Sequence, residues 1–226
     1  MKDLFLSKGL SLTEEQLKKF EKYYELLVYY NQKFNITAIT EKEEVYKKHF
    51  VDSLIGVDKI KGRTLIDIGS GGGFPAIPLK IYNDSLDVTM VEATGKKCEF
   101  LREVIHQLGL QGVKVINDRA ELLVKKEGMR EGFDVCSARA VARLNTLLEY
   151  CLPFVKVGGR FVSYKGDAEE EIIEAENAIK VLGGKLIDTE AEELFGAKRQ
   201  IVVVEKIKKT DAKYPRGNGK ERKNPL

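Results

Sequence analysis

The chain has 226 residues, 43% hydrophobic and 32% charged, with a formal net charge of +3, which is enough apolar material for the core of one domain with appendages. No stretch approaches the roughly 20 apolar residues that a membrane span needs, and the N-terminus lacks the apolar region of a secretory signal. Three cysteines without C-x-x-C spacing and only two histidines argue against a metal site, so we expect a cytoplasmic protein with reduced thiols and no metal.

Two helices are expected ahead of residue 60. Residues 13–34 carry apolar side chains at helical spacing, and Thr13 forms a capping box with Gln16 three residues on. A second helix is expected over roughly 41–57. The buried face of the first helix should carry Leu17, Phe20, Tyr24, Leu27 and Val28. Its paired tyrosines could stack on bases, but we favour a contact with the rest of the domain for Tyr23, Tyr24, Tyr29 and Tyr30.

From residue 64 onward, short apolar runs alternate with helical patterns. Strand-like runs occupy 64–69, 87–93, 113–117, 133–138, 159–166, 185–194 and 199–207. This alternation predicts an α/β fold with a doubly wound, mostly parallel, seven-stranded sheet. No helix separates the last two strands, so they should form an antiparallel hairpin at the sheet edge. We therefore expect an N-terminal helical extension packed on the core (1–60), a core domain (61–208) and a basic tail (209–226).

The end of the chain is strongly basic. From Lys206 to Leu226, eight Lys or Arg residues stand against Asp211 and Glu221, a net charge of +6, so the remainder of the chain carries about −3. Prolines and glycines interrupt this segment. Such a composition suggests a flexible or loosely docked arm for a polyanion. A merely solubilising tail is the alternative.

The stretch DIGSGGGFP, residues 67–75, follows the first predicted strand. Ligands of doubly wound sheets bind beyond the carboxyl ends of the strands, so this loop stands where a cofactor would bind. A P-loop is excluded because no G-K-[ST] follows, and the dinucleotide pattern G-x-G-x-x-G fits only weakly. The better description is D-x-G-x-G-x-G, formed by Asp67, Gly69, Gly71 and Gly73.

An acidic residue follows this loop at the sequence separation expected for a ribose-binding carboxylate. Glu92 ends the second predicted strand, 19 residues after Gly73. A carboxylate accepts hydrogen bonds from two vicinal ribose hydroxyls, so loop and acid together favour an adenosine cofactor. Glu92 would serve NAD equally well, and a purely structural glycine turn is the remaining alternative.

The glycine motif resembles the first motif of S-adenosylmethionine-dependent methyltransferases. Further strings occur in order along the chain: FNIT, HFVDSL, DIGSGGGFPAIPL, VEATGKKCEFL, NDRAEL, FDVCSARAVARL and KYPRGNGKERKNPL. Together they resemble the bacterial small-subunit ribosomal RNA guanine-N7 methyltransferases, the glucose-inhibited division protein B family. The resemblance implies a class I, Rossmann-like methyltransferase fold. It also implies methyl transfer from S-adenosyl-L-methionine to N7 of a guanine in the 530 loop of 16S rRNA.

The resemblance also assigns cofactor contacts residue by residue. It implies that the loop binds through Gly69 and Phe74, and that the end of the second strand contacts ribose and adenine. It places the pair in DRAEL by the adenine ring and the arginine of SARAV beside the methyl donor. The residues concerned, after the loop, are Glu92, Ala93, Thr94, Ala120, Glu121 and Arg139. The chain departs from the family at Gly72, where many relatives have proline, and we expect altered loop stiffness without loss of binding.

The implied reaction agrees with the residues present. Guanine N7 has a free lone pair and no proton to lose, so no general base is needed. Cys136 lies inside an apolar strand, so we interpret it as a core residue and not as a nucleophile. The Asn/Asp-Pro-Pro-aromatic turn of amine methyltransferases is absent, since SARA occupies its place. Arg139 would then position the substrate through guanine O6 or a phosphate, with a structural ion pair as the alternative.

Several basic residues are candidates for contact with RNA, each with surface charge or structure as the alternative. They are His49, Lys165, Arg199, Lys213, Arg216, Lys220, Arg222 and Lys223. The expected partner is 16S rRNA, within the small ribosomal subunit or an assembly intermediate, bound by a monomer without a membrane. Two other functions stay open: a methyltransferase for another substrate, and a non-catalytic RNA-binding or assembly protein.

Overall fold

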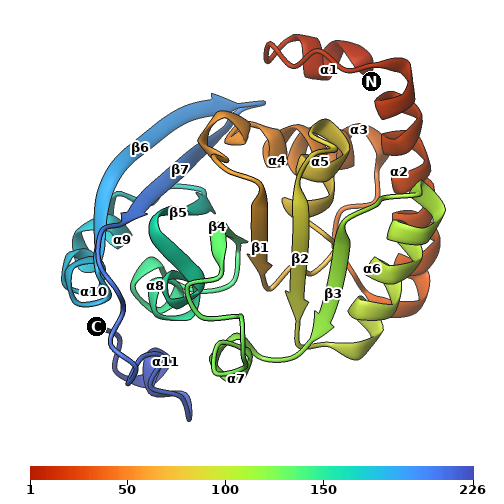
Figure 1. Cartoon of the computed structure of the whole chain (residues 1–226). Coiled ribbons are helices and arrows are strands. Elements are labelled where there is room, and N and C mark those ends of the chain that lie inside the picture. The colour runs from red at the N-terminus through yellow and green to blue at the C-terminus, as the bar shows by residue number, and fades with distance from the viewer.

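Seven strands form one sheet in the order β3-β2-β1-β4-β5-β7-β6 (Figure 1). The computed structural model describes residues 1–226. The strands are β1 (Thr64–Ile68), β2 (Asp87–Glu92), β3 (Val113–Asn117), β4 (Phe133–Arg139), β5 (Val155–Lys165), β6 (Gly184–Leu194) and β7 (Ala197–Lys206). β1 pairs in parallel with both β2 and β4, so the strand order reverses between β1 and β4. Such a switch point is where open α/β sheets bind ligands.

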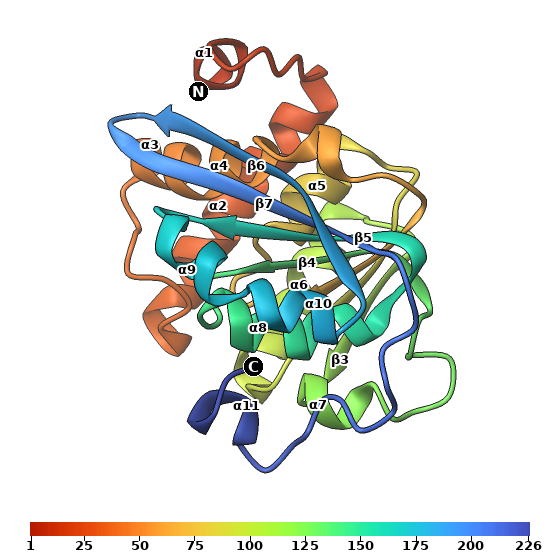
Figure 2. The same ribbon diagram turned by 90° about the vertical axis from the view of Figure 1, so that its left-hand side faces the viewer.

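The last two strands close the sheet as the sequence predicts. β6 and β7 form an antiparallel hairpin, and β7 inserts antiparallel beside β5. Figure 2 shows this hairpin and β5 running along the near side of the molecule. The prediction of a mostly parallel, seven-stranded sheet with an antiparallel edge pair is therefore confirmed.

Helices cover both faces of the sheet. Successive strand residues point to opposite faces, and Leu65 and Ile66 of β1 accordingly belong to two different buried clusters. One face is covered by α2 (Glu14–Phe34), α5 (Ala76–Tyr82) and α6 (Gly95–Leu108). The other is covered by α7 (Ala120–Leu123), α8 (Leu144–Cys151), α9 (Glu169–Glu174) and α10 (Glu176–Val181). Cys136 is buried in the second cluster, which confirms its interpretation as a core residue.

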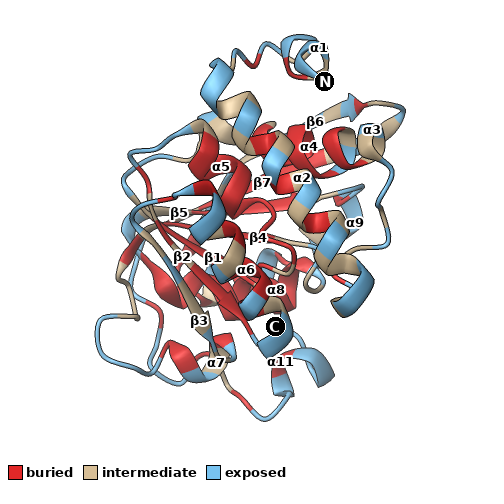
Figure 3. Ribbon diagram, turned by 90° about the vertical axis from the view of Figure 1, so that its right-hand side faces the viewer, coloured by how far each residue is buried: buried red, intermediate tan, exposed pale blue.

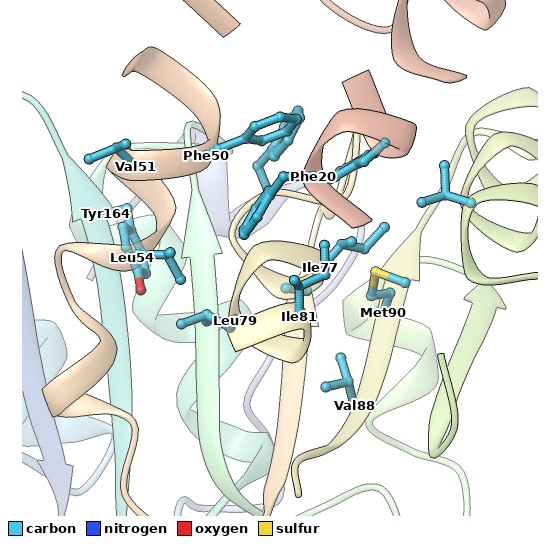
Figure 4. Close-up of a cluster of buried hydrophobic side chains, with 14 of the residues drawn as sticks. Phe20, Phe50, Val51, Leu54, Ile77, Leu79, Ile81, Val88, Met90 and Tyr164 are labelled. Carbon is cyan, nitrogen blue, oxygen red and sulfur yellow. The ribbon is translucent and has the colours of Figure 1, made fainter. Parts of the chain in front are cut away.

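The N-terminal extension shares the first cluster with the sheet. It consists of α1 (Lys2–Leu6), α2, α3 (Lys42–Val45), a π-helical turn (Tyr46–Val51) and α4 (Asp52–Leu54). The capping box of Thr13 and Gln16 is present, as predicted. Figure 4 shows Phe20 and Phe50 of the extension above α5 and β2, with which they share the buried cluster. Burying one such side chain contributes on the order of 2 kcal/mol.

The buried face of α2 differs slightly from the expected one. Tyr23, not Tyr24, is fully buried beside Phe20 and Leu27, whereas Tyr29 is 53% exposed. Figure 3 shows exposed residues along the outer side of α2 and buried strands behind it. Tyr23 therefore packs against the core of the domain, as we predicted in preference to stacking on bases.

The C-terminal segment is packed against the domain instead of forming a loose arm. It ends in the short helix α11 (Lys220–Lys223), and Tyr214 and Glu221 are buried. Arg216 pairs with Glu149 of α8, a carboxylate with no exposed surface. The basic composition of this segment therefore does not predict its packing against α8.

None of the helices has the length and apolar character that crossing a membrane requires.

Candidate functional site

The glycine loop between β1 and α5 has a backbone that only glycine accepts readily. Gly69, Gly71 and Gly73 have φ values of +72°, +55° and +92°. A Cβ on Gly73 would lie 2.5 Å from Ile77 Cδ1 and 2.7 Å from the hydroxyl of Tyr23. That hydroxyl donates to the carbonyl of Gly72. The loop is therefore held closely by α2 and α5.

Gly72 is also confined. A Cβ there would lie 2.8 Å from Phe74 Cε2 and 3.0 Å from Ile36 Cγ2. A proline at this position would thus require the Phe74 ring to shift. The structure supplies a local reason for glycine at the place where many relatives are expected to carry proline.

Glu92 ties the glycine loop to the end of β2. Its Oε2 accepts a hydrogen bond from the backbone N–H of Gly71 at 3.0 Å, and its Oε1 accepts from that of Thr94 at 2.8 Å. The side chain is close to both turns at the carboxyl ends of two neighbouring strands. A carboxylate fixed in this way is oriented to accept further hydrogen bonds.

Asp67 lies beneath the loop. It is fully buried, and its Oδ1 accepts a hydrogen bond from the hydroxyl of Ser137 on β4 at 2.6 Å. Its other oxygen, Oδ2, has no partner within the protein. Burial raises the pKa of this carboxyl to about 6, although Ser137 and Ser70 oppose the shift. Asp67 therefore joins β1 to β4 at the switch point.

A first cavity, of about 340 Å³, opens at the carboxyl ends of β1 and β2; we call it the tail-side cavity. Its apolar wall contains Ile68 and Val91, and its polar wall contains two acids and two arginines. These charged residues are Asp118, Arg119, Glu121 and Arg222. Figure 1 shows α7 and α11, the helices that carry Glu121 and Arg222, at the end of the molecule toward which β1 to β3 point. The balanced charge suits an uncharged, partly apolar portion of a ligand.

A second cavity, of about 660 Å³, lies between the N-terminal extension and the ends of β4 and β5; we call it the helix-side cavity. Five cationic and two acidic side chains line it. The cations are Lys48, Arg139, Arg143, Lys165 and Arg199, and the acids are Asp52 and Glu171. The surplus of positive charge suits an anionic ligand such as a phosphodiester chain.

Val141 lines both cavities and lies directly over the glycine loop. A Cβ on Gly69 would approach Val141 Cγ2 to 2.6 Å. The neighbouring Ala140 has a φ of +57°, which is unusual for a residue with a side chain. The turn after β4 is thus the partition between the two cavities.

Arg139 lines the helix-side cavity and contacts several of its other residues. Its Nη1 donates to Asp52 Oδ2 at 2.7 Å and to the carbonyl of Lys48 at 3.0 Å. Its guanidinium carbon lies 5.0 Å from the centre of the Phe74 ring, within the range of a cation–π contact. The other oxygen of Asp52 accepts from Nε of Arg199. One buried carboxylate therefore holds two arginines.

His49 is neutral in this setting. Burial and the charge of Arg139 lower its pKa to about 4. Its Nε2 is 2.8 Å from Thr37 Oγ1, and Arg139 Nη2 is 3.2 Å from its Nδ1. The same Nδ1 lies 3.0 Å from the carbonyl of Lys48, which only accepts, whereas the guanidinium of Arg139 only donates, so these two contacts call for opposite tautomers of the neutral ring. His49 contributes shape and a hydrogen-bond acceptor instead of charge.

The structure brings the predicted site residues together in two groups. Gly69, Ala93, Ala120, Glu121 and Arg222 line the tail-side cavity. His49, Arg139, Lys165 and Arg199 line the helix-side cavity. Arg222 differs from the other RNA candidates that line a cavity, because it lines the tail-side cavity whereas His49, Lys165 and Arg199 line the helix-side cavity.

Other predicted residues line neither cavity. The side chain of Phe74 is buried against Tyr23 and His49, and Asp67 lies below the loop. Neither cavity wall includes Gly71 and Gly73 of the loop or Glu92 and Thr94 beside it, so the contact of these four residues with a cofactor stays a prediction. In the tail, Lys213, Lys220 and Lys223 are exposed, whereas the fork of Arg216 is engaged with Glu149.

The lining residues that are not predicted from the sequence include Asp52, Asp118, Val141 and Tyr150. A signal for Asp52 exists, because it belongs to the same HFVDSL string as His49. Asp118 likewise stands just before Ala120 and Glu121 in NDRAEL. Val141 and Tyr150 are ordinary apolar and aromatic positions whose role depends on tertiary contacts alone.

Comparison with solved structures supports the fold. The chain is similar to M. jannaschii TYW2, solved in complex with AdoMet, with a TM-score of 0.58, 19% identity and coverage of 75% of this chain and 80% of that chain. It is also similar to a geranyl diphosphate methyltransferase solved with GPP and sinefungin, with a TM-score of 0.57, 12% identity and coverage of 68% and 76%. At these identities the likeness concerns the class I methyltransferase fold only.

Comparison with curated sequences is more specific. The ribosomal RNA small subunit methyltransferase G of Exiguobacterium is 48% identical over 226 residues, covering 97% of this chain and 95% of the relative. The protein of the same description from Geobacillus thermodenitrificans is 47% identical over 225 residues, covering 97% and 94%. The family model described as rRNA small subunit methyltransferase G matches residues 16–202, so the chain belongs to that family.

Proposed function

We propose that this chain transfers the methyl group of S-adenosyl-L-methionine to N7 of a guanine in the 530 loop of 16S rRNA. The observation that carries the proposal is the meeting of two unlike cavities at Val141. One is charge-balanced and lies at the glycine loop, and the other is cationic and lies at the ends of β4 and β5. A methyl donor and an RNA substrate require such adjacent sites.

The residues present fit the cofactor. The loop is open above Gly71, since a Cβ there would have only the Gly69 carbonyl oxygen within 4 Å, at a distance of 3.8 Å. Glu92, oriented by two backbone N–H groups, would hold the ribose hydroxyls, and the Asp118 carboxylate would accept from the adenine amino group. When bound, S-adenosylmethionine supplies an electrophilic methyl group on a sulfonium.

The helix-side cavity would hold the guanine and its neighbouring phosphates. Arg139 and Arg199, fixed by Asp52, present donors to guanine O6 or to phosphate oxygens. Lys165 is less free, because it donates to Glu171 and to the carbonyl of Ala142, each at 2.7 Å. Its role would be to brace the turn that carries Val141.

No residue of the chain is required to remove a proton. Guanine N7 has an in-plane lone pair, so the contribution of the protein is alignment and exclusion of water. The low pKa of His49, which makes its imidazole a weak base, and the burial of Cys136 agree with a site without a base or a nucleophile. Action as a monomer, on the small subunit or an assembly intermediate, stays a prediction.

Calorimetry followed by methyl transfer tests the proposal. The protein should bind S-adenosylmethionine and transfer labelled methyl groups to 30S subunits or naked 16S rRNA from a strain that lacks the modification. Failure to bind the cofactor would leave a non-catalytic RNA-binding protein. Binding without label on either RNA preparation would point to a methyltransferase for another substrate.

A further inference from the structure

The C-terminal segment is fixed to α8 by a buried acid and by a threonine hydroxyl. Arg216 Nε lies 2.9 Å from Glu149 Oε1 and its Nη2 lies 2.7 Å from Oε2, while its backbone N–H also donates to Oε1 at 2.8 Å. Five residues on, Glu221 is fully buried and accepts from the backbone N–H of Gly217. Its carbonyl accepts from the hydroxyl of Thr146 at 3.0 Å. The Glu149 carboxylate and the Thr146 hydroxyl, both on α8, therefore hold the segment, and the Glu221 carboxylate closes the turn within it.

This attachment brings one basic side chain into a cavity and leaves its neighbours outside. Gly219 and Arg222 line the tail-side cavity, whereas Lys220 and Lys223 of the same short helix do not. Arg222 is close to Tyr150 on α8, another residue of that wall. Burial raises the pKa of the Tyr150 phenol, and the nearby guanidinium of Arg222 opposes the shift. Arg222 is exposed, as Lys220 and Lys223 are, and differs from them in lining the cavity and in its contact with Tyr150.

The chemistry of the opposite wall indicates what Arg222 would contact. Asp118 and Glu121 stand there with Arg119, so the cavity has no surplus of positive charge that would attract a phosphate chain. Asp118 is in turn paired with Lys126 at 2.8 Å. A planar guanidinium stacks well on aromatic rings, and carboxylates accept from amino groups and hydroxyls. Together these groups suit a nucleoside.

We infer that the C-terminal segment is a wall of the cofactor site and that Arg222 contacts the adenine–ribose half of S-adenosylmethionine. The inference rests on the proposed function, in which the tail-side cavity holds the nucleoside. It changes the interpretation of the basic tail, because at least one of its cations serves the cofactor instead of RNA. Arg222 is a positioning residue for the ligand and takes no part in bond making.

Calorimetry on two matched variants tests the assignment. Arg222→Ala should weaken binding of S-adenosylmethionine about 3- to 30-fold, the range expected for loss of one guanidinium–ring contact. Methylthioadenosine, which has the nucleoside but lacks the amino-acid part, should lose affinity by a similar factor. Lys223→Ala, a neighbouring cation outside the cavity, should stay within about twofold of the wild type for both ligands.

The outcomes separate this inference from the function on which it rests. Wild-type protein that binds no S-adenosylmethionine would overturn the proposed function itself. Wild-type binding with unchanged affinity in Arg222→Ala, or with equal losses in Arg222→Ala and Lys223→Ala, would overturn only the role of Arg222. So would a loss of affinity for S-adenosylmethionine without a loss for methylthioadenosine.

A measurement without mutation tests the wall itself. Amide hydrogen exchange of residues 217–224 should slow when S-adenosylmethionine is added to the wild-type protein, because the ligand would cover and hold this segment. The exposed α9 surface serves as an internal control and should keep its exchange rate. Protection of the glycine loop without any protection of 217–224 would contradict a C-terminal wall.

Discussion

Arg139 donates to Asp52 across a distance of 2.7 Å, and this contact joins the end of β4 to the N-terminal extension. The Asp52 side chain is 5% exposed and the Arg139 side chain 15% exposed, so the pair is largely removed from water. Asp52 also accepts from Arg199 of β7. One acid thus orients two arginines from separate strands. Arg139 therefore both forms the structural ion pair that we considered as an alternative and lines the helix-side cavity.

The first prediction concerns Asp52. Asp52→Asn should lower kcat/KM for rRNA about 10- to 100-fold, because the two arginines lose the charge that orients them and small displacements at a reacting centre are costly. The Kd of S-adenosylmethionine should change by less than about twofold, since Asp52 does not line the tail-side cavity. Asp58→Asn, at an acid that is 61% exposed, is the control. Equal effects of the two substitutions would argue against an orienting role.

A second prediction concerns Glu92. Glu92→Ala should weaken binding of S-adenosylmethionine about 10- to 100-fold, through loss of charge-assisted hydrogen bonds to ribose and of the bonds that shape the glycine loop. Arg139→Ala should chiefly impair transfer. Calorimetry and single-turnover assays separate the two effects, with Glu99→Ala on the exposed side of α6 as the control. Cofactor affinity unchanged in Glu92→Ala would remove it from the site.

A third prediction follows from the neutral His49. The single-turnover rate of methyl transfer should vary less than about twofold between pH 7 and 8.5, because no group must lose a proton, His49 titrates far below this range and Asp67 titrates near pH 6. A sigmoidal rise near pH 6.5 that disappears in His49→Asn would instead identify His49 as a base. The assay is run with saturating cofactor and rRNA so that binding does not contribute.

A fourth prediction concerns stability and pH. The pKa of His49 is about 4 in the folded protein and ordinarily 6.5, so its contribution to stability is present above 6.5 and is lost as the pH falls through 4. The stability advantage of the wild type over His49→Asn should therefore shrink by about 3 kcal/mol between pH 7 and pH 4. Urea unfolding at both pH values measures it, and an advantage independent of pH would contradict the low pKa.

The contribution of Asp67 to stability has the opposite dependence on pH and serves as a comparison. Burial raises its pKa to about 6 from an ordinary 3.8, so its favourable contribution is complete below 3.8 and is lost as the pH rises through 6. The unfolding free energy of Asp67→Asn relative to the wild type should accordingly improve with rising pH. Matching slopes for the His49 and Asp67 variants would show that a general effect of pH, and not these two groups, is being measured.

A fifth prediction concerns the tail. Arg216→Ala should lower the free energy of unfolding by about 3 kcal/mol, because it leaves Glu149 buried without its partner. Lys213→Ala should have little effect, since Lys213 is 65% exposed and pairs only with the exposed Asp211. Urea unfolding compares the two. Unaltered stability of Arg216→Ala together with reduced affinity for rRNA would restore the role that the composition suggests.

Much of the architecture follows from local patterns. Alternating strand and helix signals predict the seven strands, and the absence of a helix after residue 194 predicts the β6–β7 hairpin. The glycine loop and Glu92 are predictable as a pair because both follow adjacent parallel strands. These features depend on residues that are near in sequence or on a general rule of the fold.

The remaining features depend on contacts between distant parts of the chain. Asp52 meets Arg139 and Arg199 at separations of 87 and 147 residues, which no spacing rule indicates. Tyr23 is buried instead of Tyr24 because the face of α2 that packs on the core is rotated slightly from the face predicted from the sequence. Composition predicts a flexible or loosely docked basic arm, because Glu149, the acidic partner of Arg216, lies in a helix far from the tail in the sequence.

The position of the methyl group tests the central claim most directly. 16S rRNA from a strain lacking the modification is incubated with the protein and S-adenosylmethionine, digested, and mapped by mass spectrometry. We predict one added methyl group, at N7 of a guanine within the 530 loop, with none after reaction with Arg139→Ala at the same time point. A methyl group on another atom, another base or another region of the rRNA would contradict the account.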